Sequence, residues 1–252
     1  MPRLLVRPPS PQLADGEVTH LDRVPVDPAL ARRQWEGYVG VFRARGWEVS
    51  EVPSADEHPD GVFVEDGVVV FDDLAVFGRP GAASRRGELA TLRPAVTGLG
   101  LEVAEIEAPG TLDGGDVLKI GRTVYVGRSS RTNDDGIAAL RDLLSPRGWQ
   151  VVTVPVTRVL HLKSAVTALP DGTVVGHPPE VDDPELFDRF LPVPEPEGNA
   201  VVVLDEGTVL MSASAPRSAD LFRSRGLEVV TTPVTELEKL EGCVTCLSVR
   251  LR

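Results

Sequence analysis

The sequence predicts an α/β protein in which five strand–strand–helix–strand units form a closed ring around a central channel. The first observation is a recurring helix end, in which a glycine is followed by a short Val-rich strand and a proline; the four copies lie at Gly46, Gly100, Gly148 and Gly226. The second is a pair of strand-like runs ahead of each helix. The third is a repeat period of about fifty residues, with one longer interval that leaves room for a disguised copy. An open doubly wound sheet ranks second, because it places one strand before each helix instead of two.

The predicted units follow one another along the chain. The strand pairs are residues 62–71 and 74–77, 116–121 and 123–126, 162–169 and 173–175, and 200–204 and 208–211. The disguised copy has a shortened helix at 182–190 and a strand at 191–194. The fifth pair combines residues 1–7 with residues 244–251, which closes the ring. Residues 8–19 are rich in Pro, Gly and polar side chains, and we expect them to form a mobile lid.

Length, composition and net charge limit the classes of protein to which this chain can belong. The chain has 252 residues, 42% of them hydrophobic, and we expect a single domain over residues 1–252. Its net charge of -12 argues against binding to nucleic acid or to an anionic membrane and favours a small cationic ligand. No stretch has the length of a signal peptide or a membrane span, so a cytoplasmic location is expected. Whether the protein is a monomer or a homodimer stays open.

The two cysteines, Cys243 and Cys246, lie in an apolar segment at the end of the chain. Two thiols in a reducing compartment are too few for a disulfide framework or for a metal cluster, so chemistry or packing remains. One of them is a candidate nucleophile on a terminal strand. A thiolate near neutral pH needs a base or a cation beside it, and His161 is the candidate for both proton transfers.

Several acids follow or interrupt apolar runs. Asp113 opens an Asp-Gly-Gly-Asp stretch, which is either an ordinary turn or a place where the backbone approaches a ligand while Asp113 orients the imidazole. Asp60, Glu65 and Asp66 belong to the first complete unit, and the last two interrupt a Val-rich run. Unpaired buried carboxylates are costly, and a cationic ligand relieves that cost. A guanidinium suits paired carboxylates because of its planar fork.

Two arginines supply the opposite charge. Arg85 and Arg131 stand near expected helix starts, where Ser84 and Thr132 or Asn133 can act as caps. Solvated surface arginine is the simple interpretation. The carboxylates suit a cationic group of a ligand, and the arginines suit an anionic group. Together they favour a zwitterionic ligand, such as an amino acid with a guanidinium tail.

At these residues the sequence resembles the dimethylarginine dimethylaminohydrolases of the guanidine-modifying superfamily. The matching segments occur in family order over nearly the whole chain, and together they are highly specific. They are Phe63-Val64-Glu65-Asp66, Arg79-Pro80-Gly81-Ala82 with Ser84-Arg85-Arg86, Leu112-Asp113-Gly114-Gly115-Asp116-Val117, Ser130-Arg131-Thr132-Asn133, Leu160-His161-Leu162-Lys163 and Gly242-Cys243-Val244-Thr245-Cys246-Leu247-Ser248.

The resemblance implies a five-bladed α/β propeller, the pentein fold, with the active site in its central channel. It implies hydrolysis of asymmetric dimethylarginine or monomethylarginine to citrulline and a methylamine, without a cofactor or a metal. Cys246 matches the nucleophile that forms a thiouronium intermediate, His161 the proton donor and later base, and Asp113 the acid that supports His161. The residues that match substrate contacts are Asp60, Glu65 and Asp66 for the cationic groups, Arg85 and Arg131 for the carboxylate, Val18 in the lid, and Leu240 and Glu241 for the α-amino group.

Two positions depart from the family pattern. Glu241 stands where an aspartate is expected, which puts the contact with the α-amino group in doubt, and Cys243 adds a second thiol that we interpret as packing. Alternatives to the hydrolase are an arginine deiminase or amidinotransferase, a non-catalytic arginine-binding protein, and a thiol-redox protein that uses Cys243 and Cys246.

Overall fold

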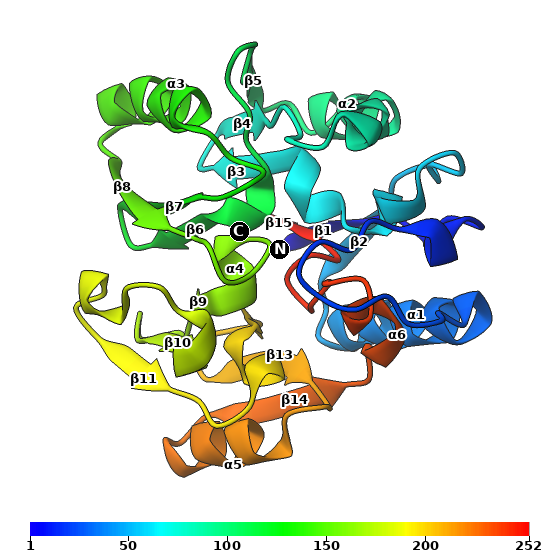
Figure 1. Cartoon of the computed structure of the whole chain (residues 1–252), viewed down its shortest axis with the longest axis vertical. Coiled ribbons are helices and arrows are strands. Elements are labelled where there is room, and N and C mark those ends of the chain that lie inside the picture. Colours follow the sequence, from blue (N-terminus) through cyan, green and yellow to red (C-terminus); the bar gives the residue numbers. More distant parts are fainter. Residues whose placement is uncertain (252) are drawn as a thin grey trace.

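Five three-stranded sheets stand around a central axis, and the longer helices lie on the outside of the ring (Figure 1). This computed structural model describes residues 1–251, so Arg252, the last residue of the expected domain, lies outside the described part. Both ends of the chain lie near the middle of the view, because the C-terminal strand pairs with the N-terminal one. The predicted five-unit ring is confirmed, and the fold is the five-bladed α/β propeller.

All five blades have the same connectivity. The inner and middle strands are antiparallel, and the middle and outer strands are parallel. From inner to outer strand, the blades are β15 (Val249–Leu251), β1 (Arg3–Val6) and β2 (Glu48–Glu51); β3 (Val68–Phe71), β4 (Leu74–Phe77) and β5 (Glu102–Glu105); β6 (Val117–Ile120), β7 (Thr123–Arg128) and β8 (Gln150–Pro155); β9 (Val166–Ala168), β10 (Val174–Gly176) and β11 (Phe190–Pro192); and β12 (Val201–Val203), β13 (Thr208–Ser212) and β14 (Glu228–Thr232).

Helices join the middle strand of a blade to its outer strand, as a parallel crossover requires. They are α1 (Pro28–Ala44), α2 (Leu89–Thr97), α3 (Asp134–Leu144) and α5 (Pro216–Ser224). The fourth blade lacks the shortened helix predicted at 182–190, and two 3₁₀ turns, Pro178–Glu180 and Pro184–Leu186, replace it. Each of these turns begins at a proline, which sets the local dihedral angle but cannot continue a hydrogen-bonded helix from the preceding turn. The short helices α4 (Leu162–Ala165) and α6 (Thr235–Glu238) lie at the channel and beside α1.

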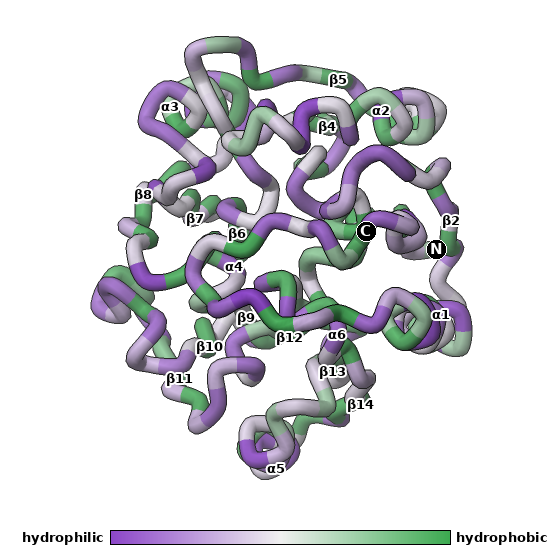
Figure 2. Tube along the Cα trace, turned by 45° about the vertical axis from the view of Figure 1, so that its right-hand side comes forward, coloured by the Kyte–Doolittle hydropathy of each residue, from purple (hydrophilic) through white to green (hydrophobic). Residues whose placement is uncertain are grey.

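The sequence accounts for where these helices start and stop. At the start of α1 the Asp27 carboxylate accepts hydrogen bonds from the backbone N–H groups of Ala29 and Leu30. Hydropathy alternates along the turns of α1, so one face is apolar (Figure 2). The glycines after the helices adopt positive φ angles, which confirms the predicted helix ends: Gly46 at 75°, Gly100 at 74°, Gly148 at 79° and Gly226 at 88°.

The apolar core consists of clusters between neighbouring blades. Val6 of the first blade shares a cluster with Leu210 of the fifth, and Leu5 shares another with Phe77 of the second. The remaining clusters join the second blade to the third, the third to the fourth and the fourth to the fifth. Each blade is therefore buried on both faces only when the ring is closed. Among residues 1–251, none of the helices combines the length and the apolar character that a bilayer crossing needs.

The inner strands are shorter than the sequence suggested. The predicted strand at 62–71 begins with the 3₁₀ turns Pro59–Val62 and Val64–Gly67, and the one at 162–169 begins with α4. Likewise, residues 244–247 form a turn, so Cys246 precedes β15 and does not lie on the terminal strand. These residues are apolar because they are buried, and short buried runs do not distinguish a strand from a turn by hydrophobicity alone.

Candidate active site

Each inner strand is preceded by a helical or tight turn, and these turns contact one another around the channel. They carry Glu65, Asp66 and Cys246, and Asp113 and His161 each stand immediately before one of them. The turns are Val64–Gly67, Gly114–Asp116, α4, Pro196–Asn199 and residues 244–247. The ring therefore brings together side chains that are distant in the sequence, such as Asp66 and Cys246, which lie 180 positions apart.

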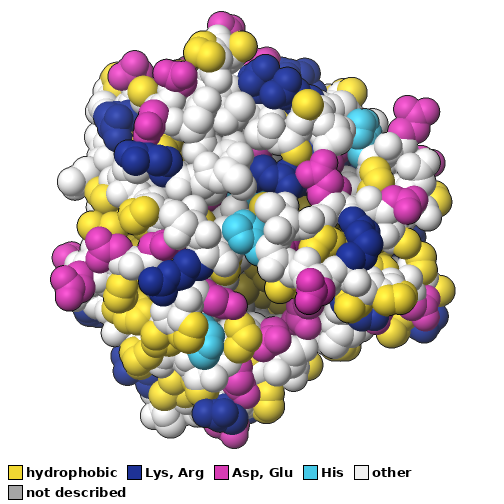
Figure 3. All heavy atoms as spheres, in the orientation of Figure 1, with side chains coloured by type: hydrophobic (Ala, Val, Ile, Leu, Met, Phe, Trp, Pro, Cys, Tyr) yellow, Lys and Arg dark blue, Asp and Glu magenta, His cyan; other side chains and the backbone are white. Residues whose placement is uncertain are grey.

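A small pocket at this place holds most of the predicted site residues. Its volume is about 20 Å³, so side chains nearly fill it. The face shown in Figure 3 is hollowed near its centre, and basic and acidic side chains lie side by side at the hollow. The lining residues are Glu17, Asp60, Phe63, Asp66, Arg85, Arg131, Leu160, His161, Leu240, Glu241, Gly242 and Cys246.

Cys246 is buried, with 5% of its surface exposed. Its backbone N–H donates to the carbonyl oxygen of Cys243, which closes the turn, and the two sulfur atoms are 3.3 Å apart. The hydrogen bond with Cys243, together with burial, raises the pKa of Cys246 well above the usual value for a thiol. The same hydrogen bond lowers the pKa of Cys243 to about 7. The contact between the two sulfur atoms thus stabilises one negative charge on the cysteine pair and disfavours the ionisation of the second thiol.

Asp113 and His161 form a buried pair. The Oδ2 atom of Asp113 lies 3.1 Å from Nε2 of His161, and neither residue is more than 3% exposed. The second carboxylate oxygen of Asp113 accepts a hydrogen bond from the backbone N–H of Gly81 at 2.9 Å. Asp113 therefore fixes the ring orientation, as the sequence suggested, and leaves Nδ1 as the imidazole nitrogen free of this contact.

His161 stands among carboxylates. Burial by itself would lower its pKa, but Asp66, Asp113 and Asp116 outweigh burial and raise the pKa to about 9. The Nδ1 atom lies 3.9 Å from Oδ1 of Asp66. In the resting protein the imidazole is thus a cation near neutral pH, which is the form a proton donor needs.

Gly115 allows this close packing. A Cβ atom at this position would lie 2.6 Å from Nδ1 of His161 and 2.7 Å from Oδ1 of Asp66. The backbone N–H of Gly115 also donates to the same Asp66 oxygen at 2.9 Å. The Asp-Gly-Gly-Asp stretch is therefore both a turn and a close backbone approach to the site.

Arg85 is tied to acids within the protein. Its Nη1 donates to Asp66 Oδ2 at 2.6 Å, and its Nε and Nη2 donate to the two oxygens of Glu88 at 2.8 and 2.9 Å. Burial opposes the charge of Asp66, but His161 and Arg85 lower the pKa of Asp66 to about 2. Asp66 is consequently a permanent carboxylate beside the imidazole.

Arg131 is the other buried arginine of the pocket. Its Nη2 donates to Oε2 of Glu17 at 2.9 Å, whereas its Nη1 is buried without a hydrogen-bond partner among the described residues. The other oxygen of Glu17 accepts from the Ser84 hydroxyl, so Ser84 contacts the lid instead of capping a helix. At the second expected cap, Asn133 accepts from the backbone N–H of Gly136 and does cap α3. A carboxylate from the lid therefore binds one terminal nitrogen of the Arg131 guanidinium, Nη2, and does not bind the other, Nη1.

The lid is fastened at two further points. Asp60, whose pKa is raised by burial, accepts the backbone N–H of Glu17 on both carboxylate oxygens, at 3.1 and 3.2 Å. The carboxylate of Glu241 accepts the backbone N–H groups of Thr19, His20 and Leu21. Glu241 also has φ at +60°, which is uncommon for a residue other than glycine. The longer side chain at this position thus binds the backbone at the last residue of the lid and at the two residues that follow it.

Two predicted substrate contacts lie outside the pocket. The Glu65 carboxylate binds Lys163 and Arg250, because successive side chains of a 3₁₀ turn fan out and Glu65 projects to the other side of the turn from Asp66. Val18 packs against the large apolar cluster to which the buried side chains of α1 belong. Its neighbour Glu17 lines the pocket instead. Leu240 lies in the pocket wall as expected.

Within residues 1–251, one group of side chains has donors that could reach a metal ion. One ligand atom each from Asp66, Asp113 and His161 lies within 4.8 Å of the others. Each carboxylate already accepts a backbone N–H, and Asp66 also binds Arg85. An imidazole with a pKa of about 9 would have to lose its proton before it could bind a metal, so this set fits an acid–base role better than a metal site.

Sequence reasoning missed residues whose role depends on the third dimension. Glu17 is an acid in an irregular segment, and Lys163 and Arg250 are single charges within apolar runs. A charge in an apolar run was the signal used for Glu65 and Asp66. The same signal applied to Lys163 and Arg250 would have identified the two partners of Glu65.

Comparison with known proteins finds relatives of one family that match nearly the full length of the chain. A Streptomyces coelicolor dimethylarginine dimethylaminohydrolase is 59% identical over 250 residues, which cover 99% of this chain and 97% of that protein. The enzyme of the same name from Pseudomonas aeruginosa is 32% identical over 98% of both chains. No family model matches the chain.

Solved structures give the same result. The Pseudomonas aeruginosa enzyme, as a cysteine-to-serine variant with citrulline, superposes with a TM-score of 0.91 at 30% identity and covers 99% of this chain and 98% of its own. A histidine-to-glycine variant of a dimethylarginine dimethylaminohydrolase, captured as an adduct with S-methyl-L-thiocitrulline, has a TM-score of 0.92. The N-terminal domain of the cyanobacterial arginine dihydrolase ArgZ has a TM-score of 0.85 at 21% identity, which shows a shared fold.

Proposed function

This chain belongs to the dimethylarginine dimethylaminohydrolase family, and we propose that Cys246, His161 and Asp113 carry out its reaction. It is a hydrolase that acts on a guanidino C–N bond of dimethylarginine. One observation carries the assignment of residues: Cys246 and a cationic His161 line the same buried pocket, and Asp113 holds the imidazole at 3.1 Å.

The substrate is a zwitterion with a guanidinium tail, and the pocket offers groups of both signs. Asp66 has a fixed negative charge beside His161 and suits the guanidinium nitrogens. Arg131 has a buried Nη1 without a partner among the described residues and suits the carboxylate. Asp60 and the backbone near Leu240 lie on the lid side, where the α-amino group would bind. Arg85 contributes by holding Asp66 in place.

The first half of the reaction forms a covalent intermediate. Cys246 gives up its thiol proton to solvent when the substrate guanidinium binds, and the resulting thiolate attacks the guanidinium carbon. The new C–S bond moves a C–N π-electron pair onto nitrogen and gives a neutral tetrahedral adduct. The His161 imidazolium gives its proton to the substituted nitrogen, the C–N bond breaks, and the methylamine leaves. A thiouronium remains on the sulfur.

The second half returns the enzyme to its starting state. His161, now neutral, accepts a proton from water, and the resulting hydroxide attacks the thiouronium carbon. The C–S bond breaks, its electron pair returns to the sulfur, the sulfur takes up the proton of the added hydroxyl, and citrulline is released. Asp113 stabilises the imidazolium each time it forms and fixes which ring nitrogen faces the reacting atoms.

The electrostatics favour reaction only when substrate is bound. In the resting protein the pKa of Cys246 is raised, by the hydrogen bond with Cys243, by burial and by the negative charges of Cys243, Glu65 and Asp66. A substrate guanidinium placed beside Asp66 adds a positive charge near the sulfur and favours the thiolate. The reactive form of the nucleophile is therefore produced next to its target.

Further properties belong to the same proposal. Monomethylarginine would fit as a smaller substrate, and the reaction needs no cofactor because the thiol and imidazole supply the nucleophile and the proton transfers. Both cysteines are free, which suits a reducing cytoplasm. We also propose a single catalytic domain and a monomer or homodimer that binds neither nucleic acid nor membrane, in keeping with the net charge of -12.

The test is a citrulline assay of the purified protein with dimethylarginine, monomethylarginine, arginine and agmatine. We expect citrulline from the two methylated amino acids and much less product from agmatine, which lacks the carboxylate that Arg131 would bind. A protein that forms citrulline from arginine but from neither methylarginine would contradict the proposal and favour a deiminase.

A further inference from the structure

We propose that Lys163 and Arg250 are positioning residues, because both bind the carboxylate of Glu65 and so fix three site-bearing turns relative to one another. The contacts are short and buried. Oε1 of Glu65 lies 2.6 Å from Nζ of Lys163 and 2.5 Å from Nη2 of Arg250. The Glu65 and Lys163 side chains are at most 9% exposed, and the Arg250 side chain is 20% exposed. This inference rests on the proposed function.

We call Glu65, Lys163 and Arg250 the triad. Each of its members is a near neighbour in the sequence of a proposed active-site residue. Glu65 precedes Asp66, Lys163 follows His161 by two positions, and Arg250 follows Cys246 by four. The three come from the turn before β3, from α4 and from β15, which belong to three different blades. One carboxylate oxygen thus links the segments that present the substrate acid, the imidazole and the thiol.

Arg250 extends the connection to the turn that contains the nucleophile. Its Nη1 donates to the carbonyl oxygen of Thr245 and to the Ser248 hydroxyl, both at 2.9 Å. The Ser248 hydroxyl lies 2.7 Å from the hydroxyl of Tyr38 on α1. In the same region the backbone N–H of Glu65 donates to the carbonyl oxygen of Cys246 at 3.2 Å. The turn is therefore held from both sides.

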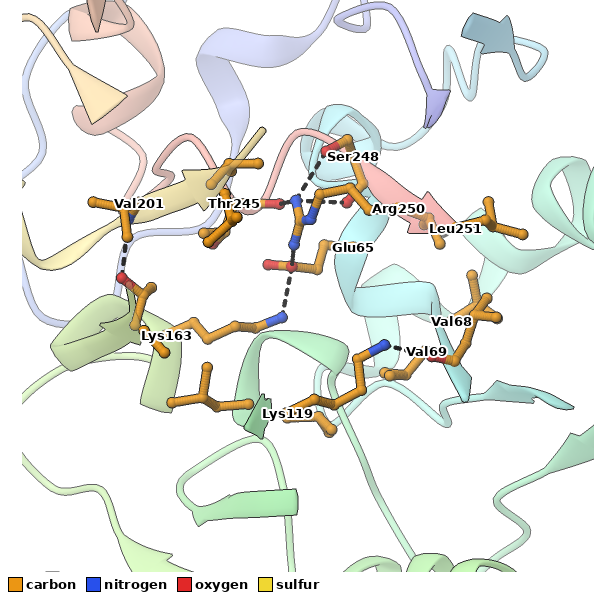
Figure 4. Close-up of a pocket in the computed structure, with 18 of the residues that line it drawn as sticks. Glu65, Val68, Val69, Lys119, Lys163, Val201, Thr245, Ser248, Arg250 and Leu251 are labelled. Atoms are coloured by element: carbon orange, nitrogen blue, oxygen red, sulfur yellow. Dashed lines mark hydrogen bonds and ion pairs between the residues drawn. The ribbon is translucent and has the colours of Figure 1, made fainter. Parts of the chain in front are cut away.

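The triad lies outside the reaction pocket. Glu65, Lys163 and Arg250 line a second cavity of about 500 Å³, and Figure 4 shows the two cations converging on the carboxylate. This cavity and the reaction pocket have no lining residue in common. Neighbours in sequence, such as Thr245 and Cys246, line opposite cavities, so the turns form a partition between them. The triad acts on the back of this partition and does not touch the substrate.

The charges of the triad decide which variants are informative. One carboxylate faces two cations, so a Lys163→Met variant still leaves Glu65 paired with Arg250. A Glu65→Gln variant instead leaves two cations without their shared anion. Lys119 lines the same cavity, and its Nζ donates to the carbonyl oxygen of Val70 at 2.5 Å. Lys119→Met is therefore a matched control that removes a lysine from this cavity but leaves the triad intact.

The kinetic test compares kcat and KM of wild type, Lys163→Met, Lys163→Arg and Lys119→Met, each normalised to its folded fraction by circular dichroism. We expect Lys163→Met to lower kcat about tenfold or more with KM nearly unchanged, because a displaced imidazole slows proton transfer while the substrate contacts remain. Lys163→Arg should recover most of kcat, and Lys119→Met should behave as wild type. A folded Lys163→Met protein with wild-type kcat would overturn the proposal.

A second measurement does not require turnover. The rate of iodoacetamide alkylation of Cys246, located by mass spectrometry at one pH, reports on the nucleophile turn in wild type, Glu65→Gln and Lys163→Met. The charged groups that act on this thiol include Cys243, Glu65, Asp66 and Arg250, and the His161 imidazolium lines the same pocket. Glu65→Gln should accelerate alkylation, because it removes a nearby negative charge and loosens the turn, and Lys163→Met, which leaves Glu65 paired with Arg250, should change the rate much less. An unchanged rate in Glu65→Gln would overturn the proposal even if the wild type made no citrulline, an outcome that would count separately against the proposed function.

Discussion

The carboxylate of Glu17 lies 2.9 Å from the guanidinium of Arg131, so a residue of the lid occupies an arginine that we assign to the substrate carboxylate. Its second oxygen binds the Ser84 hydroxyl, and its backbone N–H binds Asp60. Burial opposes the charge of Glu17, but Ser84 and Arg131 lower the pKa of Glu17. The lid therefore presents a fixed anion at a place where an amino-acid substrate presents another.

Replacing Glu17 tests this competition. Glu17→Gln should lower KM for dimethylarginine with little change in kcat, because the substrate carboxylate no longer displaces an internal one. A partly exposed ion pair contributes about 0.5–1 kcal/mol, which corresponds to a decrease in KM of about two- to fivefold. Steady-state kinetics measure the effect, and Glu36→Gln on the exposed face of α1 is the control. An increase in KM would mean that Glu17 assists binding.

His161 should couple stability to pH. Its pKa is raised from 6.5 to about 9, so its stabilising contribution is fully present below pH 6.5 and is lost as the pH rises through about 9. The shift corresponds to a free energy of unfolding on the order of 3 kcal/mol. We expect the melting temperature of wild type to fall between pH 6.5 and pH 9.5 relative to that of a variant without the imidazole.

The matched variant for this prediction is His161→Asn. Differential scanning calorimetry across the same pH range should show the melting temperature of wild type falling relative to that of His161→Asn as the pH rises from 6.5 to 9.5, whatever the absolute stability of the variant. Asp116, whose pKa is raised to about 6, titrates below this range, and Cys243, whose pKa is about 7, titrates in both proteins and cancels in the difference between them. Parallel profiles for the two proteins would show that the imidazole is neutral in the native state.

Cys243 should affect the ionisation of the neighbouring thiol. The two sulfurs are 3.3 Å apart, and the negative charge that Cys243 carries at a pKa of about 7 opposes a second charge on Cys246. Cys243→Ala removes that opposition, so the pH midpoint for alkylation of Cys246 should move to lower values. Alkylation rates followed by intact mass against pH measure the midpoint. A midpoint that rises, or does not move, would contradict this coupling.

The ring itself could be predicted from the sequence, because glycines at helix ends, paired strands and a constant period are local signals. Gly46 and Gly226 illustrate this, since each adopts the left-handed conformation that its position suggested. The turns before the inner strands could not be predicted, because buried apolar residues look alike in a turn and in a short strand. Cys246 was therefore identified correctly as a pocket residue but assigned to the wrong element.

The site was predictable where a residue's chemistry is unusual for its surroundings. His161, Asp113 and Asp66 meet as expected. The direction of a side chain in a turn is a property of the fold, and this separates Glu65 from Asp66 although they are adjacent. Likewise, the lid contacts of Glu17 and Glu241 join residues more than a hundred positions from their partners, which no local pattern reveals.

The most direct test of the account is the mass of the protein quenched with acid during turnover of dimethylarginine. Wild type and Cys243→Ser should each carry a thiouronium adduct, located on Cys246 by fragmentation, and both should release citrulline. Cys246→Ser should show neither adduct nor citrulline while remaining folded. An adduct on Cys243, or citrulline formation that survives in Cys246→Ser, would contradict the assignment of Cys246 as the nucleophile.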